Sequence, residues 1–254
     1  MASALALCLA LFSGIACAYS DAAAELYFSS IERITRYSPL EHAGSHGTLG
    51  INLGVGAGSY VLNGDDEILQ AHWRANGANQ AENETPNGRI YIPRVFFHKG
   101  LPWSLDVGFA YGLHAATKAT LAGAYMQWTA FEGFALPSIG VRGSLGRLMG
   151  LQTTDASMVN TDLLVSYGFM RIFTVYGGLG AGRSQIKVRS GDEYGTSLSL
   201  TGSSDNSSNR VGVVQTQLLG LQVQILPPFV GLTLESQKTG SGPSSYLGKL
   251  SVGM

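Results

Sequence analysis

The chain has 254 residues and a formal net charge of −1, and charged residues make up only 13% of it. That share is about half of the roughly 25% expected of a soluble domain. With 45% hydrophobic residues, the composition excludes an intrinsically disordered chain, and the lack of excess positive charge excludes a nucleic-acid binder that depends on electrostatics. Both cysteines, Cys8 and Cys17, lie in the first eighteen residues, so we expect no thiol chemistry, disulfide framework or thiolate metal site in the rest.

Residues 1–18 are predicted to be a secretory signal peptide. The segment is uncharged and ends in Ala16-Cys17-Ala18, the small-x-small pattern that signal peptidase recognises, which places cleavage before Tyr19. Two alternatives stay open, acylation of Cys17 as in a lipoprotein and an uncleaved membrane anchor. Beyond Ala18 no run of eighteen apolar residues occurs, so strands would have to make any membrane crossing there.

Residues 19–47 form a leader with one short amphipathic helix. Between Leu26 and Leu40 the apolar residues Tyr27 and Ile31 continue a helical spacing, and Pro39 ends the run. Such spacing predicts a helix with one apolar face.

From residue 48 onward, apolar residues recur at every second position over segments of about ten residues separated by turn signals. In 103–111 the alternate residues from Trp103 to Tyr111 are all apolar, with aromatic residues at both ends. Nine tilted residues suffice for a strand to cross a bilayer, and aromatic residues favour its two interfaces. The predicted strands are 48–61, 89–98, 103–111, 119–130, 137–147, 157–169, 173–188, 211–225, 229–237 and 245–254.

Connection lengths alternate along the chain. The links near 99–100, 132–133, 170–172 and 227–228 are tight, whereas those at 62–88 and 189–210 are long and polar. Short turns at one rim, longer loops at the other and an even number of strands are the layout of outer-membrane barrels. We therefore predict an all-β fold, an antiparallel transmembrane β-barrel of about ten strands over 48–254.

Charged side chains within these strands fall opposite the aliphatic face. A cation in the middle of a lipid-facing surface would cost roughly 2 to 4 kcal/mol, so the pattern predicts an apolar exterior and a polar lumen. We expect three cations and three anions to pair with one another across this lumen, either as structural pairs or as pairs that tune a narrow polar pathway. The predicted lumen charge network is Arg94, Asp106, Arg142, Asp162, Glu235 and Lys249.

Glycines of the Gly54–Gly58 stretch line the inward face and leave room in the lumen. They do not indicate a dinucleotide site, because the two-residue period continues through them instead of turning into a helix. We expect the helix of the leader to pack at the periplasmic mouth or within the lumen as a plug. The alternative is a leader that lies on the surface or is disordered.

No catalytic residue, metal site or cofactor is predicted. His42 and His46 have a spacing suited to a metal only in a helix, and Gly44 argues against one. Asp106 lies eight residues from His114 along one strand, so the two imply no catalytic triad. Acidic residues precede His72 in a long loop, for which a solvated surface is the commoner explanation.

The chain resembles the small, largely uncharacterised outer-membrane β-barrel proteins of Gram-negative bacteria. The resemblance rests on residues 94–112, 136–150, 175–182 and 246–254. It implies export to the outer membrane and recognition by the barrel-assembly machinery, although members of the class typically end in an aromatic residue and this chain ends in Met254.

We expect a narrow or plugged channel for small polar solutes or a structural envelope protein, in contact with outer-membrane lipid and with no nucleic-acid partner. One alternative is a surface adhesion or recognition barrel that acts through loops 62–88 and 189–210. Another is a membrane-embedded hydrolase, although the residues above favour a protein that is not an enzyme.

Overall fold

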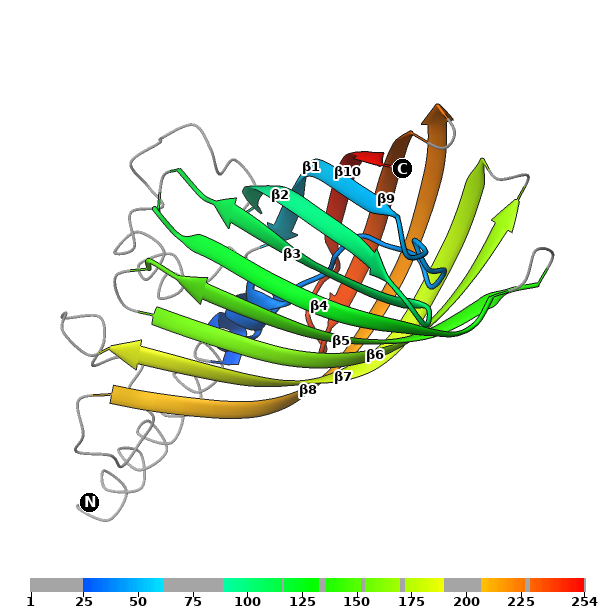
Figure 1. The fold of residues 1–254 in the computed structure, drawn as a ribbon. Helices are drawn as coiled ribbons and strands as arrows, with labels where there is room; N and C mark the ends of the chain where they lie inside the picture. The colour runs from blue at the N-terminus through cyan, green and yellow to red at the C-terminus, as the bar shows by residue number, and fades with distance from the viewer. Residues whose placement is uncertain are drawn as a thin grey trace, which may run out of the picture.

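The computed structural model describes residues 25–61, 89–115, 117–132, 136–151, 154–169, 172–189, 207–226 and 229–253. Ten antiparallel strands close into one barrel, with a single described helix, residues 25–35, inside it (Figure 1). The strands are β1 (Ile51–Val61), β2 (Arg89–Leu101), β3 (Leu105–Leu113), β4 (Thr120–Phe131), β5 (Ser138–Met149), β6 (Thr154–Phe169), β7 (Phe173–Arg189), β8 (Ser207–Leu226), β9 (Val230–Thr239) and β10 (Ser245–Gly253). No described helix is long and apolar enough to cross a membrane.

Each strand pairs with its neighbours in sequence, and β1 closes the barrel against β10. At one rim lie the start of β1, the end of β10 and the tight turns that join β2 to β3, β4 to β5, β6 to β7 and β8 to β9. We call it the short-turn rim. The opposite rim, called the long-loop rim, carries the connections 62–88 and 190–206, which lie outside the described residues.

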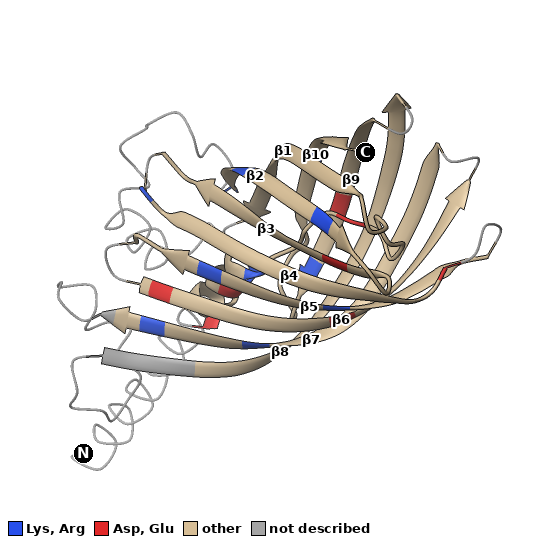
Figure 2. Cartoon of the chain, in the orientation of Figure 1, with Lys and Arg blue, Asp and Glu red and all other residues tan. Residues whose placement is uncertain are grey.

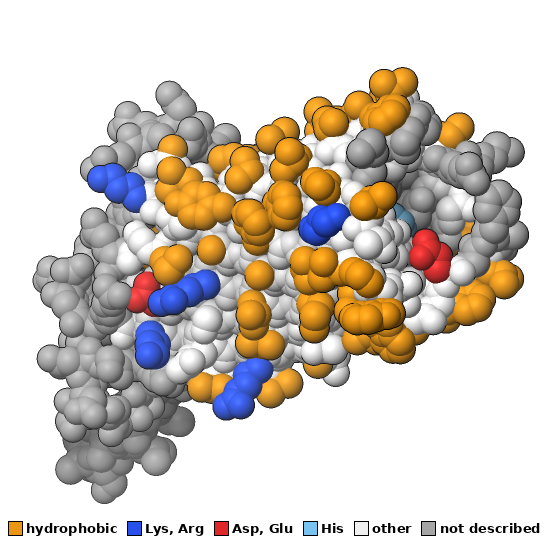
Figure 3. Space-filling model, viewed as in Figure 1, with side chains coloured by type: hydrophobic (Ala, Val, Ile, Leu, Met, Phe, Trp, Pro, Cys, Tyr) orange, Lys and Arg blue, Asp and Glu red, His pale blue; other side chains and the backbone are white. Residues whose placement is uncertain are grey.

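The two-residue period of the sequence separates an apolar exterior from a polar interior, because successive strand side chains point to opposite faces. On β6, Leu163 is 54% exposed whereas the adjacent Asp162 is 2% exposed. The same alternation runs around the barrel, so large aliphatic and aromatic side chains gather on the outside (Figure 3). A barrel that shows hydrocarbon outward and charge inward suits a lipid surrounding.

The turn between β2 and β3 differs from the prediction. β2 continues to Leu101 and β3 begins at Leu105, so the residues from 103 predicted as strand lie in the turn. Trp103 and Ser104 have φ angles of 63° and 56°, left-handed values that reverse the chain within a few residues. The carbonyl of Ser104 accepts a hydrogen bond from Thr129 at 2.9 Å, which joins this turn to β4.

Strands β6, β7 and β8 are 16, 17 and 20 residues long, longer than the ten or so residues that a tilted strand needs to cross a bilayer. The long-loop ends of β5, β6 and β7 carry charges, as the coloured cartoon shows (Figure 2). Arg147, Arg183 and Lys187 point outward and are exposed, so the prediction that strand charges face only inward was wrong. It holds for the middle of the strands, whereas these residues lie toward the long-loop rim, where lipid headgroups and water tolerate charge.

Candidate functional site

Residues 25–46, here called the lumen segment, run through the barrel from one rim to the other. At the long-loop rim, the Tyr27 hydroxyl lies 2.6 Å from the hydroxyl of Thr154, the first residue of β6. At the short-turn rim, the backbone N–H of His46 donates to a carboxylate oxygen of Asp106 at 3.1 Å. The chain then turns at Gly47, with φ of 70°, and enters β1 at Ile51.

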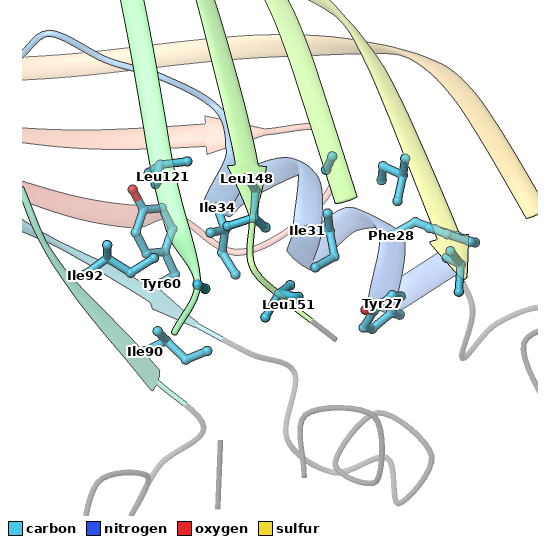
Figure 4. Packing of buried hydrophobic residues seen from close by; sticks show 14 residues of the cluster. Tyr27, Phe28, Ile31, Ile34, Tyr60, Ile90, Ile92, Leu121, Leu148 and Leu151 are labelled. Atoms are coloured by element: carbon cyan, nitrogen blue, oxygen red, sulfur yellow. The ribbon is translucent and has the colours of Figure 1, made fainter. Parts of the chain in front are cut away.

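The helix of the lumen segment fills the half of the barrel near the long-loop rim with apolar side chains. Tyr27, Phe28, Ile31 and Ile34 are at most 2% exposed. They pack against inward-facing aliphatic residues of the wall (Figure 4). Burying such side chains contributes roughly 1.5 to 3 kcal/mol each, so this end of the segment is held mainly by the hydrophobic effect.

The wall makes room for the segment with glycines. A Cβ added to Gly123 would lie 2.3 Å from the ring of Tyr37, and one added to Gly146 would lie 2.0 Å from the carbonyl oxygen of Thr35. Real Cβ atoms do not approach other atoms so closely, so a side chain at either position would displace the segment. The bare backbone of the wall is therefore part of the fit.

Farther along the segment, where Leu40 and Ala43 continue the apolar packing, polar contacts are added to it. Arg36 forms a salt bridge with Asp162 of β6 at 3.2 Å, with both side chains at most 3% exposed. The same guanidinium donates to the carbonyl of Gln217 at 3.1 Å, and Asp162 also accepts from the Thr216 hydroxyl at 2.8 Å. A buried ion pair needs such additional hydrogen bonds to offset the cost of desolvation.

Ser38 follows on the segment and contacts Glu235 of β9. Its hydroxyl donates to Oε1 of this carboxylate at 2.7 Å. The Tyr176 hydroxyl donates to Oε2, also at 2.7 Å, and the side-chain amide of Gln237 donates to Oε1. Three donors therefore occupy Glu235, none of them a cation.

Glu41 lies at the centre of the most highly charged cluster. Its Oε1 accepts a hydrogen bond from Nζ of Lys249 and lies 3.5 Å from Nε2 of His98, while its Oε2 lies 3.4 Å from Nε2 of His46. Burial alone would raise the pKa of the Glu41 carboxyl, but Lys249, His46 and His98 together hold it well below its ordinary value. Glu41 is therefore ionised in the folded protein.

Arg142 holds the backbone of the same stretch. Its Nη2 donates to the carbonyl of Glu41 and, at 2.8 Å, to Oε1 of Gln127. The Gln127 amide in turn donates to the carbonyl of His42 at 2.9 Å. Burial lowers the pKa of His42 to about 4, against a smaller raising effect of Glu41, so this ring is neutral at pH 7.

The structure places all six residues of the predicted lumen charge network inside the barrel, each at most 3% exposed. Their predicted pairing with one another is wrong, because no salt bridge joins two of them. Most instead contact the lumen segment. Asp162 contacts Arg36, Glu235 contacts Ser38, Lys249 and Arg142 contact Glu41, and Asp106 contacts His46. The barrel is wide enough to hold a polypeptide, which separates charges on opposite walls and offers each a nearer partner.

The structure specifies where the helix lies. The helix lies within the lumen, which is one of the two predicted places, and it lies next to the long-loop rim. The guanidinium of Arg33 donates to the carbonyl of Val61, the last residue of β1, at 3.1 Å. The segment therefore leads away from the long-loop rim toward the short-turn rim.

A closed antiparallel wall, an apolar exterior and a charged interior decide the fold. It is that of an outer-membrane β-barrel. No family model and no curated protein matches the chain.

Among solved structures, the N-terminal β-barrel domain of Pseudomonas aeruginosa OprF is similar with 11% identity over 82% of this chain and 97% of that chain, at a TM-score of 0.36. The KdgM porin is similar with 8% identity over 80% of this chain and 98% of that chain, at a TM-score of 0.35. Ail, the attachment invasion locus protein of Yersinia pestis, is similar with 15% identity over 81% of this chain and 96% of that chain, at a TM-score of 0.29. At these identities the likeness concerns the fold alone.

Residues considered for metal or catalytic chemistry do not converge in the described part of the chain. No group of three or more His, Cys, Asp or Glu side chains there is arranged to hold a metal ion. His42 and His46 lie outside the helix, with ring centroids 6.3 Å apart. The ring of His114 contacts the Thr117 hydroxyl at 2.9 Å in its own turn. His72 lies outside the described residues, as do the predicted signal peptide at 1–18 and the loop at 62–88 that was considered for recognition.

Protonation of His46 is expected to stabilise the docked segment. Burial lowers the pKa of this ring, but the Glu41 carboxylate and its hydrogen bond, with help from Asp106, raise it above the ordinary value of 6.5. A raised pKa in the folded state means that this contribution is complete below about pH 6.5 and is lost as the pH rises through the raised value. The charged or titratable groups around the ring are Glu41, His42, His98, Asp106 and Lys249.

The measurement is the thermal unfolding midpoint of the wild type and His46→Gln between pH 5.5 and 8.5. The wild type should exceed the variant most at low pH, and the difference should shrink as the pH rises. His114→Gln, at the opposite rim, is the matched control and should show no such trend. A difference that grows with pH would contradict the assignment.

Proposed function

We propose that the protein is an outer-membrane channel for small polar solutes that its own lumen segment closes. The observation that carries the proposal is the path of residues 25–46, which fill the lumen from rim to rim and pass through its polar half between Arg36 and His46. Arg36, Ser38 and Glu41 contact three charged residues of the wall along this path, which are Asp162, Glu235 and Lys249. A barrel with an interior of this kind would hold water if the segment left.

The nature of the contacts supports a removable closure. Between Arg36 and His46, hydrogen bonds and ion pairs, which water can replace, hold the segment together with the buried apolar contacts of Tyr37, Leu40 and Ala43. The wall behind it keeps its own polar side chains, among them Thr216, Thr233 and Gln127, all at most 1% exposed. Narrow pores select solutes through such lining charges and hydrogen-bonding groups.

Conductance in planar bilayers tests the proposal. The wild type should be closed nearly all the time, whereas a variant that lacks residues 25–46 should show frequent openings. Exchange of Glu25 for Gln leaves the segment complete and serves as the control, with conductance like that of the wild type. A deletion variant that folds, as judged by heat-dependent gel mobility, and still fails to conduct would reject the channel.

The orientation gives a separate prediction. With the long-loop rim outside the cell, a cysteine at Glu25, which is exposed at that rim, should react with a membrane-impermeant maleimide on intact cells. The sequence after residue 18 contains no cysteine of its own, so the label reports the new site against the wild-type background.

Glu132→Cys provides the matched control, since Glu132 is exposed and follows β4 at the short-turn rim. It should react only after the outer membrane is permeabilised. If Glu132→Cys reacts on intact cells and Glu25→Cys does not, the barrel has the opposite orientation.

A further inference from the structure

Arg94 on β2 is a buried cation without a hydrogen-bonding partner. Its side chain lies in the lumen at 3% exposure. No acceptor in the described part of the chain lies within hydrogen-bond distance of Nε, Nη1 or Nη2. Its guanidinium carbon lies 5.4 Å from the centre of the Tyr60 ring, a contact to a π face that satisfies none of the N–H donors. Leaving a buried charge uncompensated is among the costliest arrangements in a protein interior.

Two further donors without partners lie close to this residue. The hydroxyl groups of Tyr60 and Tyr37 are both buried and make no hydrogen bond with described residues. Tyr60 lies under the guanidinium. Tyr37 of the lumen segment packs in one buried cluster with Phe96 and Ala110, the next inward-facing residues after Arg94 on β2 and before Gly112 on β3. A guanidinium offers only donors, and a phenol can donate its proton, so the three groups together lack an acceptor.

The positions beside Arg94 on β1 and β3 supply no anion, and the Glu235 carboxylate acts on Arg94 electrostatically but makes no hydrogen bond with it. Its register partners on β1 and β3 are Gly56 and Gly112, which have no side chains. On the other side of Gly56 comes Lys249, a second cation, whose partner is Glu41. The carboxylate of Glu235 already accepts from Ser38, Tyr176 and Gln237.

We propose that Arg94, Tyr37 and Tyr60 form a binding site for a small monovalent anion in the lumen. The anion supplies the acceptor that all three groups lack, and charge-assisted hydrogen bonds to a guanidinium are the stronger kind. Enclosure among aromatic rings and glycines favours a halide-sized monovalent ion over sulfate or phosphate, because burying a second charge without a second cation would add a large desolvation cost. The site joins wall to segment, since Tyr37 belongs to the segment and the other two residues to the wall.

Anion-dependent stability tests the site. Protein purified in a non-ionic detergent is heated in sodium chloride, sodium bromide or sodium gluconate at equal ionic strength. A ligand that binds only the folded state raises the unfolding midpoint with concentration until the site saturates. Chloride and bromide should therefore raise the midpoint of the wild type above its value in gluconate, a bulky organic anion that serves as the non-binding reference.

Arg94→Met should abolish the difference between chloride and gluconate. Arg147→Met, which removes an exposed arginine from the exterior of β5, should retain it. A wild-type midpoint that is the same in all three salts means that water satisfies the guanidinium, and this overturns the proposal. A halide effect that survives in Arg94→Met overturns it as well.

Tyr60→Phe keeps the proposal testable if Arg94→Met fails to fold. Loss of one hydrogen bond of about 1 kcal/mol weakens binding about fivefold, so half of the halide effect should require about five times more chloride than in the wild type. An unchanged chloride dependence in folded Tyr60→Phe would show that the Tyr60 hydroxyl does not bind the anion, and this would overturn the proposal.

Discussion

Replacement of Lys249 by Met is expected to lower the free energy of unfolding by about 3 to 5 kcal/mol, the usual cost of removing one partner of a buried ion pair. The substitution leaves the Glu41 carboxylate, 2% exposed as a side chain, without its cation in the interior. His46 and His98 lie 3.4 and 3.5 Å away, and protonation of either ring at low pH would offset part of the loss. Denaturant unfolding in lipid vesicles near pH 8 measures the effect.

The double variant Glu41→Gln/Lys249→Met separates an ion pair from a general packing defect. With both charges gone, neither member of the Glu41–Lys249 pair is left as a buried charge without its partner. The double variant should therefore recover much of the stability that Lys249→Met loses. Lys99→Met is the matched control, because Lys99 donates to the carbonyl of Thr48 in an exposed contact at 2.8 Å and should cost little. Equal losses in the single and the double variant would show that Glu41 and Lys249 are not coupled.

The same cluster links stability to gating. Lys249 belongs to the last strand and Glu41 to the lumen segment, so their contact holds the closure against the wall. In planar bilayers Lys249→Met should open more often than the wild type, in the direction of the variant without residues 25–46. Lys99→Met should not. Loss of stability without any rise in open probability would mean that the pair stabilises the barrel but does not hold the segment.

The architecture could be predicted because a strand in lipid leaves a local pattern. Alternation along β3 and β6 follows from which face touches hydrocarbon, and this is decided residue by residue. The turn at Trp103 was not predicted, because an apolar residue with positive φ fits the alternation as well as a strand residue does. The outward charges Arg183 and Lys187 were not predicted, because the two-residue period does not mark where a strand leaves the bilayer.

The site was predictable only in its wall. That Asp162 and Lys249 face inward follows from the alternation. Their partners Arg36 and Glu41 lie more than a hundred residues away, in a leader that lacks the two-residue period of the strands. Three cations and three anions on the wall balance one another, so composition gave no sign that the charged residues of the lumen segment also enter the lumen. Only the path of the chain through the barrel brings Glu41 to Lys249.

An arginine on the lipid-facing wall tests the environment on which the other arguments depend. Leu163 lies on β6, 54% exposed on the exterior, opposite Val141 of β5 and Leu179 of β7. With bilayer hydrocarbon around it, Leu163→Arg should lower the free energy of unfolding in vesicles by about 2 to 4 kcal/mol. In a protein surrounded by water, the same exposed position would accept a charge with little loss, within about 0.5 kcal/mol.

Depth along the wall provides the internal control. Gln185 is exposed on the exterior of β7, between Arg183 and Lys187 near the long-loop rim. Because the cost of a lipid-facing arginine falls to about 0 to 1 kcal/mol near the interfaces, Gln185→Arg should fold nearly as well as the wild type. Equal costs at Leu163 and Gln185 would contradict a bilayer around the middle of the barrel, since only a lipid surrounding makes the cost depend on depth.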